Sequence, residues 1–436
     1  MLLPILIIIF GAYFLFKLRF FYILHPRKAF REMRKNLNAK GSFKALMLAL
    51  AGTLGVGNIV GVAFGLSVGG AGALFWIWVS AFFSSAIKYC ESTLASDMKT
   101  DGHGGMMYVV KDSFNTLGKP LSYLYGAICL FLAFLIGAAF QSKSIAESAE
   151  VGFGISSIFV SALVAVLTVL VIAFGTKRIE NATAVIIPIA TLLYTVICLV
   201  VIFANFSKLP YIMSEIFKKA FDFKSAAGGV AGFVSSKAVS EGFARGLLSN
   251  EAGAGTSSMA QSRSHASKPS VVGLFGISEV FFDTILLCSL TGFAVLLGTD
   301  DLSGSGISIV LRAIGATFGA LAAPVFFLLI FLFAYSTIIC WYYYASECAF
   351  YLTSKKGGAL FTSLFAVFVF MGPMFPERLV IYASDLMLFI MSLITLSTLM
   401  KNAERICDLS AECGFIKRKS KDSYAGKNVD SRGGES

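Results

Sequence analysis

The sequence predicts an all-α polytopic membrane protein, and three observations lead to that fold class. Hydrophobic residues make up 57% of the 436 residues and charged residues only 14%, against about 25% charged in soluble domains. The mean hydropathy is +0.79, and apolar stretches recur from Met1 to Met400. A soluble domain of this size needs far more polar surface. The composition therefore excludes a cytosolic enzyme, a secreted disulfide scaffold and a disordered chain.

Apolar stretches of spanning length define the expected helices, since a spanning helix needs about 20 mostly apolar residues. Ten stretches qualify: 2–24, 43–66, 71–95, 120–142, 155–175, 184–206, 270–298, 317–350, 357–374 and 379–400. The first reads as a span because it lacks the basic start and small-residue cleavage site of a signal peptide. An eleventh stretch, 226–262, is rich in Gly and Ser and carries charges, so hydropathy alone would reject it.

The distribution of charge in the loops decides whether 226–262 crosses the membrane, because cytoplasmic loops carry an excess of Lys and Arg. The stretch 25–44 holds one Glu and a run of basic residues: Arg27, Lys28, Arg31, Arg34, Lys35, Lys40 and Lys44. It is therefore expected in the cytoplasm, with the N-terminus outside. If 226–262 does not cross, acidic Asp300–Asp301 falls inside and basic Lys355–Lys356 outside. If it crosses, both pairs obey the rule, so we expect eleven helices with the C-terminus in the cytoplasm.

This count divides the chain into six parts. We expect an N-terminal transmembrane helix at 1–24, a basic cytoplasmic loop at 25–42, a first five-helix repeat at 43–206, an external loop with a candidate interfacial helix at 207–225, a second five-helix repeat at 226–400, and a loosely ordered cytoplasmic tail at 401–436. An odd number of spans in each repeat gives the two repeats opposite orientations in the membrane.

The first helix of each repeat is interrupted by glycine. Residues 51–61 contain four glycines and Asn58, and residues 245–258 are again polar and Gly-rich. Each Gly costs about 1 kcal/mol against Ala in a helix interior. Close helix packing would explain Gly57 and Gly61. The alternative is a helix that unwinds in mid-membrane, where its free backbone groups line a cavity.

Two such interruptions at corresponding places favour the second explanation. They are the sequence pointer to the binding site of a secondary transporter with an inverted repeat. Free N–H groups suit a substrate carboxylate, and free carbonyl oxygens suit a desolvated cation such as Na⁺.

Several motifs resemble the alanine or glycine:cation symporter family. They are Gly57–Ala63, Gly69–Ala73, Phe75–Val79, Lys88–Glu91, Arg245–Gly255 and Tyr335–Tyr343. The resemblance implies sodium-coupled uptake of small neutral amino acids, alanine or glycine first and D-alanine as a further candidate. It also implies the inverted-repeat fold of the bacterial leucine transporter, preceded by one extra N-terminal helix.

The resemblance also implies which residues form the site. The substrate-binding residues would be Thr53, Gly55, Gly57, Gln141, Phe243, Leu248, Thr337 and Trp341. The sodium-binding residues would be Ala51, Leu54, Asn58, Ser336 and Thr337. Ser and Thr in membrane helices usually bond their own backbone, so the two hydroxyl ligands rest on the resemblance. Na⁺ would be the coupling ion, with no organic cofactor and no other metal.

A few residues depart from the family pattern or invite another interpretation. Lys143 stands near the expected pocket where the family has Asn, which puts the substrate in doubt unless Lys143 pairs with Glu147 outside the site. Lys88 and Glu91 look like a pair at a cytoplasmic helix end. Glu251 is interpreted as a cap of the second half-helix, where a carboxylate favours the N-terminus.

The leading hypothesis is a sodium symporter in the bacterial cytoplasmic membrane, whose partners are a small neutral amino acid and membrane lipid. No nucleic-acid partner is expected, because the basic residues lie in loops and the tail; an obligate protein partner stays open. Proton coupling is the alternative, although none of the expected pocket residues titrates. A membrane-embedded transferase would need a catalytic cluster or a loop of about 60 residues, and the sequence shows neither, so this class is disfavoured. A channel is disfavoured because an inverted repeat indicates alternating access.

Overall fold

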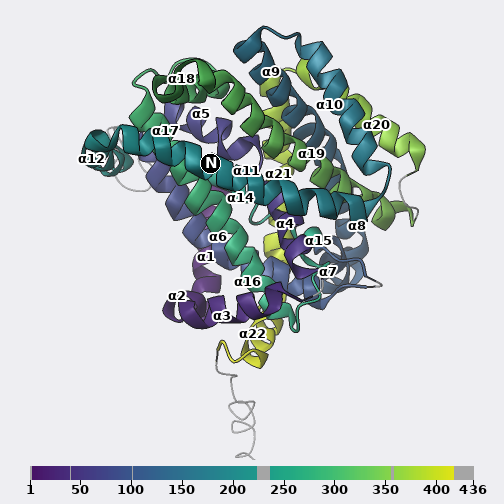
Figure 1. Cartoon of the computed structure of the whole chain (residues 1–436). Coiled ribbons are helices and arrows are strands. Elements are labelled where there is room, and N and C mark those ends of the chain that lie inside the picture. The colour runs from purple at the N-terminus through teal and green to yellow at the C-terminus, as the bar shows by residue number, and fades with distance from the viewer. Residues whose placement is uncertain (1, 40, 101, 223–235, 355–357, 417–436) are drawn as a thin grey trace, which may run out of the picture.

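The computed structural model describes residues 2–39, 41–100, 102–222, 236–354 and 358–416 (Figure 1). These residues form helices joined by turns and loops, with one isolated bridge between Thr100 and His103. Positions 226–235 of the second repeat, Lys355–Lys356 and the tail from 417 lie outside the described residues.

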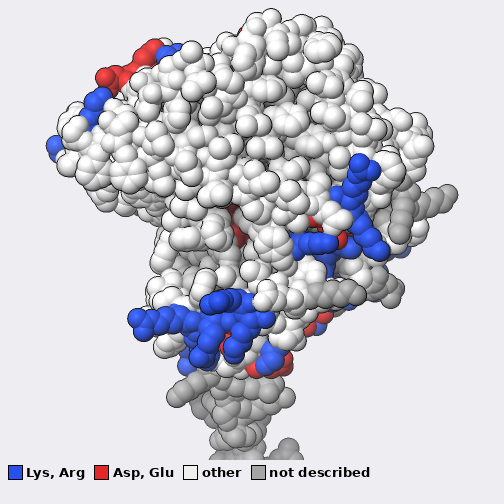
Figure 2. Space-filling view, in the orientation of Figure 1, with Lys and Arg blue, Asp and Glu red and all other residues white. Residues whose placement is uncertain are grey.

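The N-terminal region departs from a single span over 2–24. Helix α1 (Leu2–Lys17) ends early, because Arg19 and Phe20 adopt positive φ angles of 54° and 51° before α2 (Phe21–Leu24). The basic loop is itself helical, as α3 (Pro26–Leu37). Figure 2 shows Lys and Arg side chains gathered low on the molecule, where Figure 1 places α3, with a second basic group at the right and a wide uncharged surface above.

The first repeat region begins with the broken helix and continues through long helices. Its elements are α4 (Ser42–Thr53), η1 (Val56–Asn58), α5 (Val60–Gly69), α6 (Gly72–Asp97), α7 (Met106–Ser113), α8 (Asn115–Leu132), η2 (Ala133–Phe140), α9 (Gln141–Phe153), α10 (Ser157–Ile172) and α11 (Thr176–Ala204). The segments on the two sides of the first break meet at a bend of 61°. The π-helical turn η2 joins α8 to α9 in one continuous span.

A short helix and the second repeat region follow. They comprise η3 (Phe206–Lys208), α12 (Leu209–Ala220), α14 (Lys237–Asn250), α15 (Ser258–Gln261), α16 (Pro269–Val280), η4 (Phe281–Cys288), α17 (Ser289–Gly298), α18 (Gly306–Phe318), η5 (Gly319–Leu321), α19 (Ala322–Thr353), α20 (Ala359–Met371), η6 (Gly372–Met374), α21 (Glu377–Lys401) and α22 (Ala403–Glu412). Helix α12 lies in the expected external loop and exposes Tyr211 and Phe217. Its place at the membrane interface stays a prediction.

Six described helices are long and apolar enough to cross a membrane, and the bent pair α4–α5 makes a seventh. Three shorter apolar helices, Leu3–Lys17, Ser157–Ile172 and Ala359–Met374, add to them. The count of eleven and the orientation of the termini stay predictions. Helices α18 and α22 lie where the sequence analysis expected a loop and a loosely ordered tail. A search for apolar stretches of spanning length does not detect them, because α18 is too short and α22 is short and polar.

Helix α6 is the central element, since α1, α14 and α16 all pack along it. Glycine permits the closest approach: a Cβ added to Gly276 on α16 would lie 2.8 Å from the Lys88 carbonyl oxygen on α6. This contact brings the side chains of Lys88 and Glu279 together in the interior.

Candidate functional site

The first break frees backbone carbonyls at the end of α4. The Gly55 N–H donates to the Thr53 carbonyl at 2.8 Å, and the Asn58 N–H donates to the Gly55 carbonyl at 3.3 Å. In a continuous helix these two N–H groups would meet the carbonyls of Ala51 and Leu54. Both predicted carbonyl ligands therefore lose their helical donors at the break.

Side chains from two distant helices meet the backbone of this break. The Gln141 Oε1 atom accepts a hydrogen bond from the Val56 N–H at 3.3 Å. Trp341 Nε1 donates to the Gly52 carbonyl at 3.2 Å. Gly52 and Val56 are four residues apart, so the two side chains replace a single missing helical bond with one donor and one acceptor.

Thr337 lies at the same place, one helical turn before Trp341 on α19. Its hydroxyl donates to the Phe333 carbonyl at 2.9 Å and lies 3.4 Å from the Leu54 carbonyl oxygen. A Cβ added to Gly55 would lie 2.9 Å from the Thr337 Oγ1 atom and 3.2 Å from the Gln141 Oε1 atom. The centre of the break therefore has room for glycine and little else.

Leu248 of α14 forms the facing wall of the break. A Cβ added to Gly57 would meet Leu248 Cγ at 3.8 Å, an ordinary van der Waals distance. The structure thus brings together the predicted residues of α4, α9, α14 and α19 at one point.

Three predicted residues have other contacts. The Ser336 hydroxyl donates to the Phe333 carbonyl at 2.8 Å, as a helical Ser commonly does. Thr53 Oγ1 lies 3.5 Å from the Leu50 carbonyl oxygen. Phe243 belongs to a separate apolar cluster, in which its ring centroid lies 6.1 Å from that of Trp76.

A fully buried carboxylate lies beside Asn58 that the sequence analysis did not assign to the site. Asn58 Nδ2 donates to the Asp283 carboxylate and to Ser249 Oγ at 3.1 Å. The Ser249 hydroxyl donates to Asp283 Oδ1 at 2.8 Å. Asp283 stands in the π-helical turn η4 and is 0% exposed. An ionisable residue within a span was the available signal.

Lys143 does not point its charge at the break. Its ammonium donates to the Phe375 carbonyl at 3.1 Å and lies 3.5 Å from the Pro373 carbonyl oxygen. The charge is therefore taken up by the backbone around η6.

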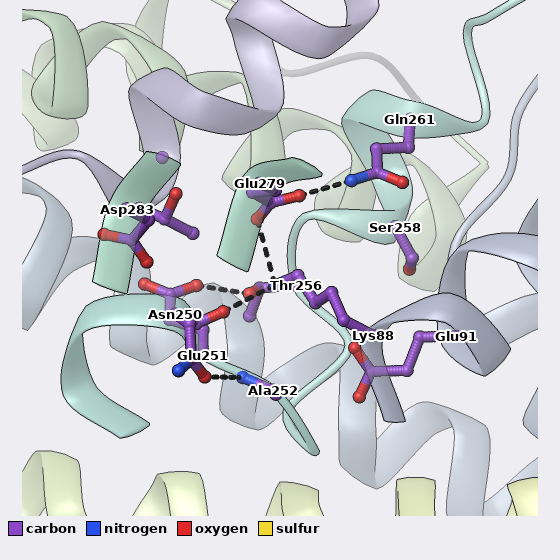
Figure 3. A network of polar contacts seen from close by, with 12 residues as sticks. Lys88, Glu91, Asn250, Glu251, Ala252, Thr256, Ser258, Gln261, Glu279 and Asp283 are labelled. Carbon is purple, nitrogen blue, oxygen red and sulfur yellow. Dashed lines mark hydrogen bonds and ion pairs between the residues drawn. The ribbon is translucent and has the colours of Figure 1, made fainter. Parts of the chain in front are cut away.

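The second break separates α14 from α15, and three of its residues have positive φ. The angles are 51° at Glu251, 91° at Gly253 and 74° at Gly255. Lys88 Nζ donates to the Asn250 carbonyl at 2.6 Å, and the Gly253 N–H donates to Glu91 Oε1 at 2.7 Å. Side chains of α6 therefore complete the backbone of this break (Figure 3).

The structure corrects two interpretations of charged residues near the second break. Lys88 does not pair with Glu91 at a helix end: its Nζ lies 3.0 Å from Glu279 Oε1, and all three residues are 0% exposed. Glu251 follows the C-terminal end of α14, where it accepts a hydrogen bond from the Thr256 hydroxyl, and so does not cap the start of α15. In the described part of the chain, no group of three or more His, Cys, Asp and Glu residues is arranged to hold a metal ion.

Comparisons with known proteins show the family of the chain. The family model described as the sodium:alanine symporter family matches residues 1–420. The chain is 34% identical to the sodium/alanine symporter AgcS of Methanococcus maripaludis, over 76% of this chain and 74% of AgcS. It is 35% identical to YrbD of Bacillus subtilis, a putative sodium/proton-dependent alanine carrier protein, over 81% of this chain and 77% of YrbD.

A solved structure shares the fold. The crystal structure of MhsT in complex with L-phenylalanine superimposes with a TM-score of 0.61 at 15% sequence identity, covering 87% of this chain and 93% of MhsT. This likeness confirms the predicted all-helical, leucine-transporter-like fold. The matched family, AgcS and YrbD are described as transporters, so the prediction that the chain is no enzyme is confirmed as well. The chain therefore belongs to the sodium:alanine symporter family, as a multi-pass membrane protein among amino-acid symporters.

Proposed function

We propose that this chain imports small neutral amino acids, alanine or glycine first, by sodium-coupled alternating access at the first break. One observation carries the proposal: the Gly52 carbonyl and the Val56 N–H are met by the Trp341 N–H and the Gln141 side-chain oxygen. An amino-acid zwitterion offers the same two groups, an ammonium donor and a carboxylate acceptor. It therefore fits this gap once Gln141 and Trp341 swing aside.

The narrowness of the break supports a small substrate. Thr337 and Gln141 approach Gly55 so closely that even a methyl group there is crowded. Leu248 faces Gly57 from the other side. Lys143 is engaged by backbone carbonyls around η6, so its charge is not directed at the break, where it would repel the substrate's ammonium group.

Oxygen atoms at the break supply ligands for Na⁺. We assign the ion to the carbonyls of Ala51 and Leu54 and to the hydroxyl of Thr337, with Ser336 turning its hydroxyl inward from the same helix and Asn58 contributing its side-chain oxygen. A hard monovalent cation prefers such carbonyl and hydroxyl oxygens. Asn58 Oδ1 is buried and has no hydrogen-bond partner among the described residues.

Proton coupling stays the second candidate, because Asp283 is a titratable group in direct contact with Asn58. A proton on Asp283 would replace the ion's positive charge there. The relative YrbD bears a name with both ions. The two couplings differ in whether a pH gradient alone drives accumulation.

The basic residues of α3 support a cytoplasmic position for this segment, because cytoplasmic loops are rich in Lys and Arg. The N-terminus would then lie outside a bacterial cytoplasmic membrane. A cysteine introduced at exposed Arg31, in a background where the native thiols are replaced, should react with a membrane-impermeant reagent only from the cytoplasmic side. Labelling from outside in intact cells would show the opposite orientation.

Uptake of labelled alanine and glycine into proteoliposomes tests the function. An inward Na⁺ gradient should drive accumulation, whereas equal K⁺ should not. Thr337→Val removes the hydroxyl at nearly constant shape and should raise the Na⁺ concentration for half-maximal uptake, whereas Thr337→Ser keeps it near the wild-type value. Equal accumulation driven by a pH gradient without Na⁺ would show that the proton, not sodium, is the coupling ion. Accumulation of other amino acids but not of alanine or glycine would overturn the substrate assignment.

A further inference from the structure

A cluster of charged side chains is buried beside the second break, apart from the first break and its predicted residues. It comprises Lys88 and Glu91 of α6, Glu251 at the end of α14 and Glu279 of α16 (Figure 3). Their exposed fractions are 0%, 0%, 6% and 0%. We call these four residues the α6 cluster.

The α6 cluster has one cation for three carboxyl groups. Lys88 Nζ is committed to Glu279, at 3.0 Å, and to the Asn250 carbonyl, at 2.6 Å. Gln261 donates to the other oxygen of the Glu279 carboxylate, whose Oε1 atom has the ion pair with Lys88 but no hydrogen bond among the described residues. Within the described ranges no Lys, Arg or His nitrogen lies at ion-pair distance from Glu91 or Glu251.

Glu91 is the more demanding of these two carboxyl groups. Its Oε1 atom accepts a hydrogen bond from the Gly253 N–H, whereas its Oε2 atom is buried and has no hydrogen-bond partner in the described part of the chain. An ionised carboxylate in the interior of a membrane protein is costly unless its charge is compensated. A buried acid without such compensation takes up a proton instead.

One side of the cluster borders a cavity. Glu251 lines a cavity of about 500 Å³ between α1, α14 and α21, whose wall also carries Asp385 and Ser392. Glu251 is thus the member of the cluster placed to exchange protons with that cavity.

We propose that Glu91 and Glu251 form a proton-binding site whose occupancy depends on the shape of the second break. Both carboxyl groups bond residues of the break itself: Glu91 bonds the Gly253 N–H, and Glu251 the Thr256 hydroxyl. A rearrangement of residues 251–256 therefore changes the surroundings of both acids at once. By linkage, proton binding at the pair shifts the equilibrium between the shapes of the break by the same free energy.

Other titratable groups face the pair and belong to its titration. Besides Lys88 and Glu279, they are Tyr125 of α8 and Cys340 and Tyr344 of α19. Asp283 of η4 interacts with Lys88 and Glu279 and so belongs to the same titration indirectly. Asp385 lines the same cavity as Glu251. Interacting acids share their protons, so Glu91 and Glu251 are treated as one unit.

Infrared difference spectroscopy of the purified, lipid-reconstituted protein tests the site without any substrate. The wild type at neutral pH should show the carbonyl-stretch band of a protonated carboxylic acid, shifted in heavy water and lost as the pH is raised. Glu91→Gln keeps the acceptor for the Gly253 N–H and should lose part of this band. The control Glu412→Gln removes an exposed carboxyl group on α22 and should leave the band intact.

The proposal is overturned if the wild type lacks the band, or if Glu91→Gln and Glu251→Gln both keep it whole. If a variant fails to fold, the pH titration of the wild-type band still tests the site, since a band that does not change with pH contradicts it. A second arm measures uptake at a fixed Na⁺ gradient over a range of pH: the wild-type rate should vary with pH and the Glu91→Gln rate should not. If the wild type and Glu91→Gln had the same pH profile of uptake, proton binding at the pair would not be linked to the transport cycle, and the linkage would be overturned. The infrared arm stands even if sodium or alanine proves to be wrong.

Discussion

Adding one methyl group at Gly55 should close the first break without unfolding the protein. Gly55 has φ −113°, so alanine fits its backbone. The new Cβ would lie 2.9 Å from Thr337 Oγ1 and 3.2 Å from Gln141 Oε1, whereas carbon contacts are optimal at about 3.5–4.0 Å. Both side chains must move by a few tenths of an ångström.

Overpacking of this kind costs about 1–3 kcal/mol, and each 1.4 kcal/mol is about tenfold in affinity. If the cost falls on the bound state, the KM of Gly55→Ala for alanine should rise by roughly 5- to 150-fold. The assay is initial-rate uptake of labelled alanine into proteoliposomes, with the melting temperature in detergent as the measure of folding.

Gly126→Ala is the matched control. Gly126 is also buried in a span, but its added Cβ would meet Leu352 at 3.5 Å, an ordinary contact. This variant should keep the wild-type KM, and it gains helix propensity of about 1 kcal/mol. A wild-type KM in Gly55→Ala, or an equal rise in both variants, would refute the idea that the first break is the substrate site.

Three further changes have defined outcomes. Lys88→Met leaves the Glu279 carboxylate without its cation and should cost about 3–5 kcal/mol of stability, seen as a lower melting temperature in detergent. Trp341→Phe removes the donor that occupies the Gly52 carbonyl before substrate binds, so the substrate's ammonium group no longer has to displace it. Substrate binding should gain about 0.5–1.5 kcal/mol, measured as a lower KM. Gly276→Ala places a Cβ 2.8 Å from the Lys88 carbonyl oxygen and should lower the melting temperature, by about 1–3 kcal/mol of stability.

Each of these changes has a comparison that separates cause from general damage. For Lys88→Met, the comparison is Lys17→Met, which breaks the partly exposed pair with Glu404 and should cost less than about 1 kcal/mol. If Lys88→Met changed the KM but left the melting temperature unchanged, the ion-pair argument would be contradicted. An unchanged KM in Trp341→Phe would remove Trp341 from the site, and a stable Gly276→Ala would show that α6 and α16 can move apart freely.

The sequence predicted the two breaks well, because their signals are local. The cost of glycine in a helix does not depend on what lies opposite. Residues 51–61 and 245–258 therefore marked unwound backbone before any partner was known. The structure has non-helical backbone at Leu54–Gly55 and at 251–257. Helix α18 was missed because hydropathy detects spans and overlooks short amphipathic helices.

The identities of the polar partners could not be predicted in the same way. Asn58 and Asp283 are 225 residues apart, and their contact depends on how η1 packs against η4. Phe243 was expected in the pocket, yet the rotation of α14 about its axis turns it toward Trp76. Hydropathy and motif order do not specify that rotation.

By itself, the sequence determined the membrane class and the two places where helices unwind, since these follow from composition and local backbone cost, and its motifs carried the resemblance to the family. Only the tertiary structure decided which side chains complete the unwound backbone. Lys88 is the clearest case, because the sequence offered Glu91, three residues away, as its partner. The packing of α16 against α6 through Gly276 brought in Glu279 instead. A buried charge takes the partner that packing provides, and packing is a property of the whole fold.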